Sequence, residues 1–344
     1  MKRILVVSVN WLGDSVLCLP IFKALKNKFP ASYIGVMAVK RLEDIFECNP
    51  YIDEVIAFDE RESQKSLKGK VQFIKLLRAK KFDTVFFVQR SFTRVLLCFL
   101  GGIKSRIGYR RLKNSFVLTT KIDMPKGLMH RQDYYFYLFE KTGIEITDKT
   151  VDFSLPEDAR SKISKFLLPI SQNHSFIIGI NPSANWEMKR WPGNYFAELC
   201  KRLVKELNAG IIFVGAAKER PLVSNIRGML GVETYDYCGE TTLKELAVLL
   251  KNTDLFISND SGPAHLAASL GVKTLVIFGP TSDLITAPRG KFVKIIKKDV
   301  NCKIPCYNAK CPNNVCMKNI SVSDVFVVAK ETLDEHSEHE EKSQ

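Results

Sequence analysis

Residues 259–271 read NDSGPAHLAASLG and come directly after an apolar run, so they lie where a predicted strand turns into a predicted helix. The first turn of that helix holds four candidate site residues: Asp260, Ser261, Gly262 and His265. Ser261 and His265 are four residues apart and share one face of the helix. Because free N–H groups at a helix start favour an anion, the pattern predicts a phosphate site, with Asp260 accepting from a sugar hydroxyl. A histidine packed in the core is the alternative role for His265.

Two more loops after predicted strands carry residues that can bind or react. Residues 8–20 (SVNWLGDSVLCLP) place Asp14 at the start of a helix, where an N-cap is the alternative to a chemical role. Residues 181–196 (NPSANWEMKRWPGNYF) place Lys189 just before another helix, and a capped loop with a packed tryptophan is the alternative there. Ligands of open parallel sheets bind outside the carboxyl ends of the strands. We therefore expect Lys189 to face a diphosphate bound at residues 259–271.

These loops require strands and helices in alternation, and the sequence contains them. Short apolar runs predict strands at 3–9, 33–39, 54–58, 83–88, 176–180, 210–215, 255–259 and 274–279. Helical patterns lie between them, for example at 15–28, 64–80, 194–208, 242–251 and 261–270. The alternation predicts an α/β protein built from βαβ units. The near-continuous runs of Ile, Val and Phe predict parallel strands that are covered on both faces.

The alternation stops between residues 145 and 175, where polar residues dominate, and then resumes. With 344 residues, of which 46% are hydrophobic, the chain is long enough to form two cores. We therefore interpret the polar segment as a linker. One domain is expected over residues 1–160, a second over residues 161–335, and a polar tail over residues 336–344.

No apolar stretch of the sequence is long enough to cross a bilayer. The longest run near the middle, 95–103, is well short of the ~20 residues that a spanning helix needs. The first residues, MKRILVVSVNWLGD, have the basic tip and apolar run of a signal peptide, but Asn10 and Asp14 interrupt the run before any cleavage site. We therefore expect this segment to be the first core strand of a cytoplasmic protein.

The nine cysteines fall into two groups. Five stand singly among apolar residues, as expected of small hydrophobic side chains in a reducing compartment: Cys18, Cys48, Cys98, Cys200 and Cys238. The other four form the pattern C-x3-C-x4-C-x4-C over residues 302–316. Four thiols can hold zinc, but structural zinc sites favour a C-x2-C pair, so we expect no metal here.

The net charge of +14 is concentrated in one segment. Residues 61–131 hold 18 Lys and Arg against 3 Asp and Glu, which accounts for the whole excess. Such a concentration is typical of proteins that bind nucleic acid, an anionic membrane surface or a phosphorylated substrate. Within it, residues 65–81 predict an amphipathic helix with Val71, Ile74 and Leu77 on its apolar side. A simple solvated face is the alternative for the lysines of that helix.

Four motifs, in this order, resemble one known family. They are VNWLGD at 9–14, NPSANWEMKRWP at 181–192, NDSGPAHLAASLG at 259–271 and FGPTS at 278–282. From residue 1 to about 330, the chain resembles glycosyltransferase family nine, the bacterial ADP-heptose:lipopolysaccharide heptosyltransferases, and most of all those that add the second heptose. The resemblance implies a GT-B fold, in which two Rossmann-like domains with parallel sheets face across a cleft. It also implies that the first domain binds the acceptor and the second the nucleotide sugar.

The resemblance assigns roles to single residues. It makes Asp14 the general base, Lys189 a ligand of the donor phosphates, and residues 260–265 the donor loop. Ser183 and Glu219 are implied donor-site residues as well, with Glu219 beside the nucleoside. The chain departs from the family at Ser183, where many members have glycine, and this departure removes no functional group.

The implied reaction is the attack of an acceptor hydroxyl on the anomeric carbon of a heptose bound to ADP. Asp14 would take the proton, while Lys189 and the helix that begins near Ser261 would neutralise the departing diphosphate. The chain contains no Asp-x-Asp pair of the kind that holds a metal-bound diphosphate. We therefore expect an inverting transfer that uses ADP-heptose as the donor and needs neither a metal nor another cofactor.

The basic segment has a candidate partner in such a reaction. Inner-core lipopolysaccharide carries carboxylates and phosphates, and a guanidinium group binds either of them with two parallel hydrogen bonds. The expected acceptor ligands are Arg90, Arg94, Arg106 and Arg110. The same charge would hold the enzyme at the anionic cytoplasmic face of the inner membrane, as a peripheral protein.

Two other functions are compatible with parts of the sequence. A basic nucleic-acid-binding protein would explain the charge, but it leaves the loops at 181 and 259 unexplained, so we expect no nucleic acid as a partner. A nucleotide-sugar epimerase of GT-B type would keep the fold and change the reaction.

Overall fold

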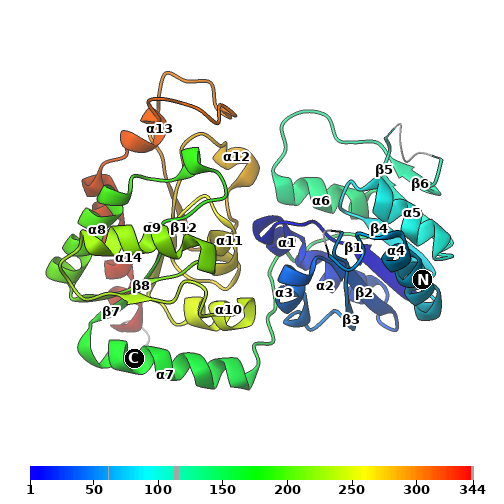
Figure 1. Ribbon diagram of the computed structural model, residues 1–344, viewed down its shortest axis with the longest axis horizontal. Helices are drawn as coiled ribbons and strands as arrows, with labels where there is room; N and C mark the ends of the chain where they lie inside the picture. The colour runs from blue at the N-terminus through cyan, green and yellow to red at the C-terminus, as the bar shows by residue number, and fades with distance from the viewer. Residues whose placement is uncertain (61, 112–115, 342–344) are drawn as a thin grey trace. The chain divides into compact units, whose positions relative to one another are not determined.

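The computed structural model describes residues 1–60, 62–111 and 116–341. The chain divides into two compact units, Met1–Ser154 and Leu155–Gln344, a few residues before the boundary placed between 160 and 161 from the sequence. Each unit contains one six-stranded parallel sheet with helices packed against it (Figure 1). The α/β fold class predicted from the alternation is therefore confirmed.

In the first unit, β1 (Arg3–Val7) lies in the middle of the sheet, whose order is β3-β2-β1-β4-β5-β6. The other strands are β2 (Tyr33–Ala38), β3 (Glu54–Ala57), β4 (Thr84–Phe87), β5 (Ser105–Tyr109) and β6 (Thr120–Ile122). Leu5 of β1 pairs with Gly35 on one side and with Val85 on the other. The strand order reverses at β1, so the loops after β1 and β4 are neighbours at the edge where such sheets bind ligands.

The helices of the first unit connect these strands. They are α1 (Leu12–Cys18), α2 (Pro20–Lys28), α3 (Glu43–Glu47), α4 (Leu67–Lys80), α5 (Phe92–Leu100) and α6 (Arg131–Glu140). The predicted helix over 15–28 is divided into α1 and α2, which meet at Leu19 because Pro20 lacks the N–H that a continuous helix would use. The α1 helix packs against α6, and this contact brings residues far apart in sequence together.

The second unit repeats the design with the strand order β12-β11-β10-β7-β8-β9. Its strands are β7 (Phe176–Asn181), β8 (Ala209–Phe213), β9 (Tyr235–Asp236), β10 (Leu255–Asn259), β11 (Thr274–Ile277) and β12 (Val293–Ile296). Here the order reverses between β7 and β10, which pair in parallel with Phe256 opposite Gly179. The loops after these two strands are the ones that carry the 181–192 and 259–271 motifs.

The second unit has helices beyond those named from the sequence, and the longest of them in the polar segment is α7. The helices of this unit are α7 (Glu157–Asn173), α8 (Gly193–Leu207), α9 (Arg220–Gly228), α10 (Leu243–Lys251), α11 (Gly262–Ser269), α12 (Asp283–Thr286), α13 (Val315–Lys318) and α14 (Val322–Glu341). The interpretation of residues 145–175 as a linker was wrong for α7, because Ile163, Leu167 and Ile170 form a buried stripe among its polar residues. The predicted tail from 336 to 344 continues α14 as far as Glu341, and its last three residues lie outside the described residues.

Closely packed apolar cores against the sheets of both units hold the loops in place. All residues of β4 and β8 are buried, as the continuous apolar runs predicted. The core of the second unit gathers Trp191, Phe213 and Met317 from widely separated segments. All the predicted strands are present, whereas β5, β6, β9 and β12 were missed because polar or charged residues interrupt their apolar runs.

Candidate functional site

The loops after β7 and β10 hold the expected phosphate and sugar ligands side by side. Lys189 ends a short 3-10 turn (Glu187–Lys189), and Asp260 directly follows β10. Lys189 Nζ lies 2.6 Å from Asp260 Oδ2, and Thr281 Oγ1 donates to the same oxygen over 2.7 Å. The side chain of Asp260 is 5% exposed and that of Lys189 is 22% exposed. The carboxylate therefore lies inside the protein, while the Lys189 side chain is partly exposed.

A buried amide fixes the two loops to each other. Asn259, the last residue of β10, accepts from the backbone N–H of Trp191 over 3.0 Å and donates to the carbonyl of Pro182 over 2.8 Å. Trp191 is fully buried rather than packed on the surface, and its Nε1 donates to the carbonyl of Ile320. These bonds anchor both ends of the loop that carries Lys189, so its ammonium group has a defined position near Asp260.

The helix α11 begins beside this pair. Ser261 is its N-cap residue, with an extended backbone, and within the described chain no cap side chain accepts a hydrogen bond from its first turn. The Ser261 hydroxyl is instead 2.8 Å from that of Ser258. Gly262 is partly exposed and His265 is buried one turn later. The backbone N–H groups at the start of α11 are therefore suited to an anion such as a phosphate.

Ser183 and Glu219 form a second contact in the same unit, across the loops after β7 and β8. Ser183 Oγ donates to Glu219 Oε1 over 2.7 Å, and the backbone N–H of Ala216 donates to Oε2 over 2.9 Å. A Cβ atom at Gly215 would lie 2.6 Å from Oε2, so the glycine leaves room for the carboxylate. Both carboxylate oxygens are held, and the side chain of Glu219 has a fixed orientation.

In the first unit, Asp14 lies in the first turn of α1 and faces α6. The N-cap of α1 is Trp11, so Asp14 is not the cap that the sequence offered as an alternative. Tyr135 Oη donates to Asp14 Oδ1 over 2.7 Å, and Arg131 Nε lies 3.8 Å from the same oxygen. The Asp14 side chain is 25% exposed, which leaves it accessible to a ligand.

Burial fixes the protonation of the neighbours of Asp14. The pKa of Tyr135 is raised far above its usual range, chiefly by burial and then by the Asp14 charge. The pKa of the Cys18 thiol is also raised, by burial first and by Asp14 second. Tyr135 therefore remains a phenol and a hydrogen-bond donor to Asp14 over the whole physiological range.

Thr281, Tyr135 and Arg131 were not predicted as site residues. Thr281 belongs to the FGPTS motif at 278–282, and its place in this motif, just after β11, is the signal in the sequence that marks it. Arg131 and Tyr135 are four residues apart and therefore share a face of α6, but the sequence does not show that this face meets α1.

The comparison with known protein families assigns the chain to one of them. The model described as "Glycosyltransferase family 9 (heptosyltransferase)" matches residues 70–316, which is well over half of the chain. The protein belongs to glycosyltransferase family 9. The resemblance stated from the motifs and the prediction that the chain is a glycosyltransferase are thereby confirmed.

The relatives of this family 9 glycosyltransferase align over most of its length. It is 28% identical to lipooligosaccharide heptosyltransferase 2 of Campylobacter jejuni serotype O:2, over 94% of this chain and 96% of that one. It is 26% identical to lipopolysaccharide heptosyltransferase 2 of Salmonella typhimurium, over 86% of this chain and 88% of that one.

Two solved structures share the fold of the glycosyltransferase. A glycosyl transferase family 9 protein from Veillonella parvula superposes with a TM-score of 0.89 and 23% identity, covering 97% of this chain and 98% of that one. Escherichia coli ADP-heptose lps heptosyltransferase II superposes with a TM-score of 0.83 and 23% identity, covering 98% and 100%. The two parallel-sheet units are thus those of the predicted GT-B fold.

The four arginines expected to bind an acceptor differ in their surroundings. Arg94 of the glycosyltransferase is 1% exposed and donates to the carbonyl of Ser8 and to Asn10 Oδ1, over 3.2 and 2.9 Å. Burial lowers its pKa. We therefore do not assign Arg94 to the acceptor, since its buried guanidinium holds the loop after β1.

The other three arginines are closer to the surface. Arg106 donates to the carbonyl of Val117 over 2.7 Å and lies over the Phe99 ring, so its guanidinium already has partners within the protein. Arg110 is exposed and pairs with Asp123 at 3.1 Å. Arg90 is exposed and lies 4.8 Å from the centre of the Tyr134 ring. Arg90 and Arg110 therefore remain available to an anionic ligand.

The late cysteines of the glycosyltransferase lie between β12 and α14, three of them in irregular chain and Cys316 in the short helix α13. All are free thiols, with Cys302 exposed and Cys316 buried. The backbone N–H of Cys306 donates to the carbonyl of Pro280, next to Thr281. Among the residues described, no group of three or more His, Cys, Asp or Glu side chains is placed to hold a metal ion. The segment therefore packs against the donor-side loop without a recognisable ligand set.

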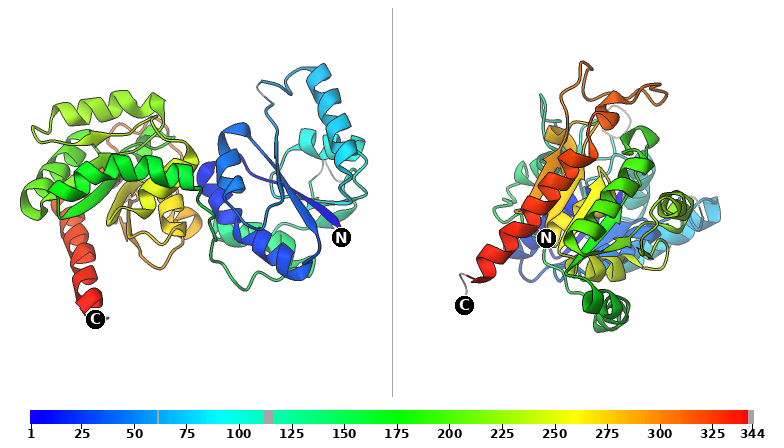
Figure 2. Two further views of the ribbon diagram at one scale, coloured as in Figure 1. Left: turned by 90° about the horizontal axis from the view of Figure 1, so that it is seen from below. Right: turned by 90° about the vertical axis from the view of Figure 1, so that its left-hand side faces the viewer.

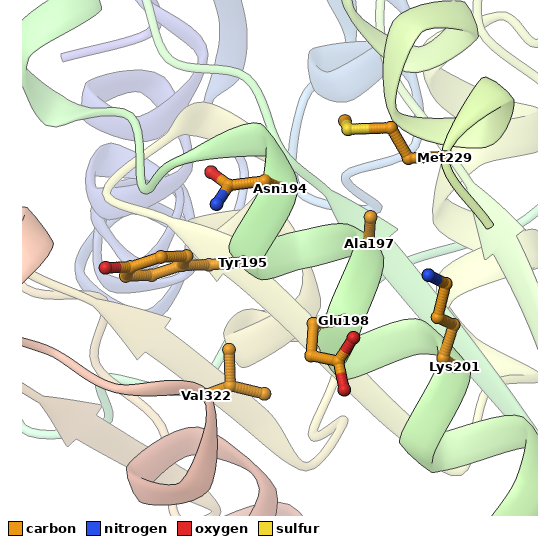
Figure 3. A pocket seen from close by; sticks show the side chains of 7 residues that line it. All are labelled: Asn194, Tyr195, Ala197, Glu198, Lys201, Met229 and Val322. Carbon is orange, nitrogen blue, oxygen red and sulfur yellow. The ribbon is translucent and has the colours of Figure 1, made fainter.

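A surface hollow of about 410 Å³ lies on the second unit (Figure 3). Its lining comes from the outer side of α8, the residue after α9 and the start of α14: Asn194, Tyr195, Ala197, Glu198, Lys201, Met229 and Val322. None of the predicted donor residues lines it, so we assign it no part in the reaction.

Over the described ranges, no helix has both the length and the apolar character needed to cross a membrane.

Proposed function

We propose that the protein transfers a heptose from ADP-heptose to the inner core of lipopolysaccharide, as a heptosyltransferase of type 2. The observation that carries the proposal is the Lys189–Asp260 pair, which lies beside the start of α11 at the point where the strand order of the second unit reverses. Ligands of such sheets bind at this point. The names of the relatives, heptosyltransferase 2 in Campylobacter and Salmonella, support the choice of donor and acceptor.

The donor is assigned to the second unit. The diphosphate of ADP-heptose binds the N–H groups at the start of α11 and the ammonium group of Lys189. In the structure, this ammonium group pairs with the carboxylate of Asp260. The fixed carboxylate of Glu219 accepts from hydroxyl groups of the nucleoside, with Ser183 holding its orientation. Asp260 keeps Lys189 in place before the donor arrives.

The acceptor and the general base are assigned to the first unit. Tyr135 occupies Oδ1 of Asp14, so Oδ2 takes the proton of the attacking acceptor hydroxyl. The acceptor oxygen bonds to the anomeric carbon as the bond from that carbon to the phosphate oxygen breaks, and ADP leaves. One displacement inverts the configuration at the anomeric carbon. Arg90 and Arg110 bind acidic groups of the acceptor core.

The leaving group is stabilised by protein groups, so the transfer requires no metal. The chain has no Asp-x-Asp pair, while Lys189 and the start of α11 together supply positive charge where the diphosphate binds. Because the acceptor is a glycolipid, the enzyme works as a peripheral protein at the cytoplasmic face of the inner membrane.

One assay tests the proposal and its nearest alternative. The purified protein is incubated with ADP-heptose and a core glycolipid that carries a single heptose, and the glycolipid is examined by mass spectrometry. We expect the mass of one added heptose, with and without a chelator. An altered nucleotide sugar in the absence of any acceptor would support an epimerase instead. No added sugar on the acceptor would contradict the proposal.

A further inference from the structure

The inner face of α4 packs against the core of the first unit. Ser66 caps its start by accepting from the backbone N–H of Gly69 over 3.0 Å. Phe73 and Leu77 are buried in the core of the first unit. The helix is therefore fixed on the sheet by these residues, and its outer face makes no contribution to the core.

The outer face of α4 combines exposed apolar side chains with positive charge. Leu67 is 80% exposed, Val71 is 51% exposed and Leu76 is 39% exposed. The helix has no acidic residue and five basic ones: Lys68, Lys70, Lys75, Arg78 and Lys80. In Figure 2, α4 stands at the edge of the first unit. We call the exposed residues Leu67, Lys68, Val71 and Lys75, which lie on one side of the helix, the α4 face.

The end of α5 continues this surface. The guanidinium Nε of Arg78 donates to the carbonyl of Leu100 over 3.0 Å, which joins the end of α4 to the end of α5. Phe99 is 48% exposed and Leu100 is 40% exposed. Exposed apolar residues and cations thus occur together on two neighbouring helices. A surface that only met water would need the cations and not the large apolar side chains.

We infer that the α4 face docks the enzyme on an anionic membrane surface. Helices that lie in the membrane interface pair an apolar stripe, which enters the acyl boundary, with lysines that meet anionic headgroups. Nucleic acid would satisfy Lys68 and Lys75, but it offers no partner for exposed Leu67 and Val71. The inference rests on the proposed function, because a glycolipid acceptor places the reaction at a membrane.

Vesicle binding tests the docking surface. The full chain is sedimented with vesicles of phosphatidylethanolamine and phosphatidylglycerol, and separately with vesicles of phosphatidylcholine alone. We expect binding to the anionic vesicles only. Leu67→Ser with Val71→Ser, and separately Lys68→Glu with Lys75→Glu, should each reduce the bound fraction at least tenfold, because the apolar and the ionic contacts are both needed.

Matched controls lie on the second unit. Leu168 on α7 is 57% exposed, and Lys205 and Lys251 are exposed on α8 and α10. Leu168→Ser, and Lys205→Glu with Lys251→Glu, should leave vesicle binding unchanged. If the α4 variants bind vesicles as well as the wild type does, the assignment is wrong. It is also wrong if an oligonucleotide displaces the vesicles and the Leu67→Ser, Val71→Ser variant binds like the wild type.

A transfer assay separates docking from catalysis. With a soluble acceptor freed of its acyl chains, the α4 variants should transfer heptose at the wild-type rate, because none of their positions belongs to the site. With the acceptor embedded in anionic vesicles, they should be slower in proportion to their lost binding. A wild-type protein that binds vesicles through α4 but transfers no sugar would contradict the proposed function and leave the docking surface standing.

Discussion

The phenol of Tyr135 donates a 2.7 Å hydrogen bond to Oδ1 of Asp14, and the two residues are 121 positions apart in the chain. Tyr135 is buried on α6, and its raised pKa keeps the proton on the phenol. The bond therefore commits one oxygen of Asp14 and leaves the other for chemistry. A carboxylate that only capped a helix would not need a second helix to orient it.

Replacing Asp14 by asparagine tests its role as the base. Asparagine keeps the size and can still accept from Tyr135, but it cannot take the acceptor proton. Turnover should fall by ~10²–10⁴-fold, with the affinity for ADP nearly unchanged. Thermal unfolding should show a stability change below ~1 kcal/mol, because Trp11 and not Asp14 is the N-cap. An Asp14→Asn enzyme with half its turnover would remove Asp14 from the mechanism.

Tyr135→Phe tests whether the hydrogen bond orients the base. Loss of one hydrogen bond to a charged group is worth about 1.5–3 kcal/mol, so kcat should fall by at least ~10-fold. The KM for ADP-heptose should not change, because Tyr135 lies in the unit assigned to the acceptor. Tyr137→Phe on the same helix is the control and should behave like the wild type. Equal kcat values for the two variants would contradict a positioning role for Tyr135.

The motifs located the candidate residues but not their partners. Asp14, Lys189 and Asp260 follow recognisable strands, and ligand sites lie at the carboxyl ends of such strands, so their positions could be predicted. That Lys189 pairs with Asp260, whereas Ser183 pairs with Glu219, depends on β10 and β8 lying on opposite sides of β7. Strand order is set by the packing of the whole sheet, which local patterns do not report.

Lys189→Ala should weaken donor binding and slow transfer together, because in the proposed reaction its charge contacts the diphosphate both before and during the transfer. The variant also leaves Asp260, which is 5% exposed, with Thr281 as its remaining donor among the contacts described above. Since Lys189 is partly exposed, we expect a loss of only about 1–2 kcal/mol in unfolding free energy, less than for a fully buried pair. Calorimetry with ADP and unfolding in denaturant measure the two effects.

A control for Lys189 is Lys205→Ala, which removes an exposed lysine of α8. It should alter neither ADP binding nor turnover. If the Lys189 variant matches this control in both measurements, Lys189 contributes only surface charge, and the donor assignment loses its main cation.

Gly215→Ala should displace Glu219 without unfolding the protein. The added methyl group would lie 2.6 Å from Glu219 Oε2, which is the far end of a side chain that can move away. ADP should then bind more weakly, by ~10-fold, since one hydrogen bond to a charged group is lost. Gly228→Ala is the matched control, because a Cβ there meets nothing within 4 Å. Wild-type ADP affinity for Gly215→Ala, with Glu219 displaced, would contradict the nucleoside role of Glu219.

The buried Arg94 shows a limit of reasoning from composition. Its place in a strongly basic segment indicated a surface ligand, but it belongs to the apolar helix FTRVLLCFL, and its side chain points to the loop after β1. One of its partners is a backbone carbonyl, which every residue has, so no residue type in the sequence marks the contact. Only the pairing of β1 with β4 brings the start of α5 beside Ser8.

Arg90 and Arg94 should therefore respond differently to substitution. Arg94→Met leaves the carbonyl of Ser8 and the amide of Asn10 without their donor, so we expect a loss of about 2–4 kcal/mol in unfolding free energy. Arg90→Met removes an exposed guanidinium and should change stability by less than ~0.5 kcal/mol. In transfer assays Arg90→Met should raise the KM for the acceptor severalfold while the KM for ADP-heptose stays constant. An unchanged acceptor KM for Arg90→Met, with a stable fold, would remove Arg90 from the proposed acceptor site.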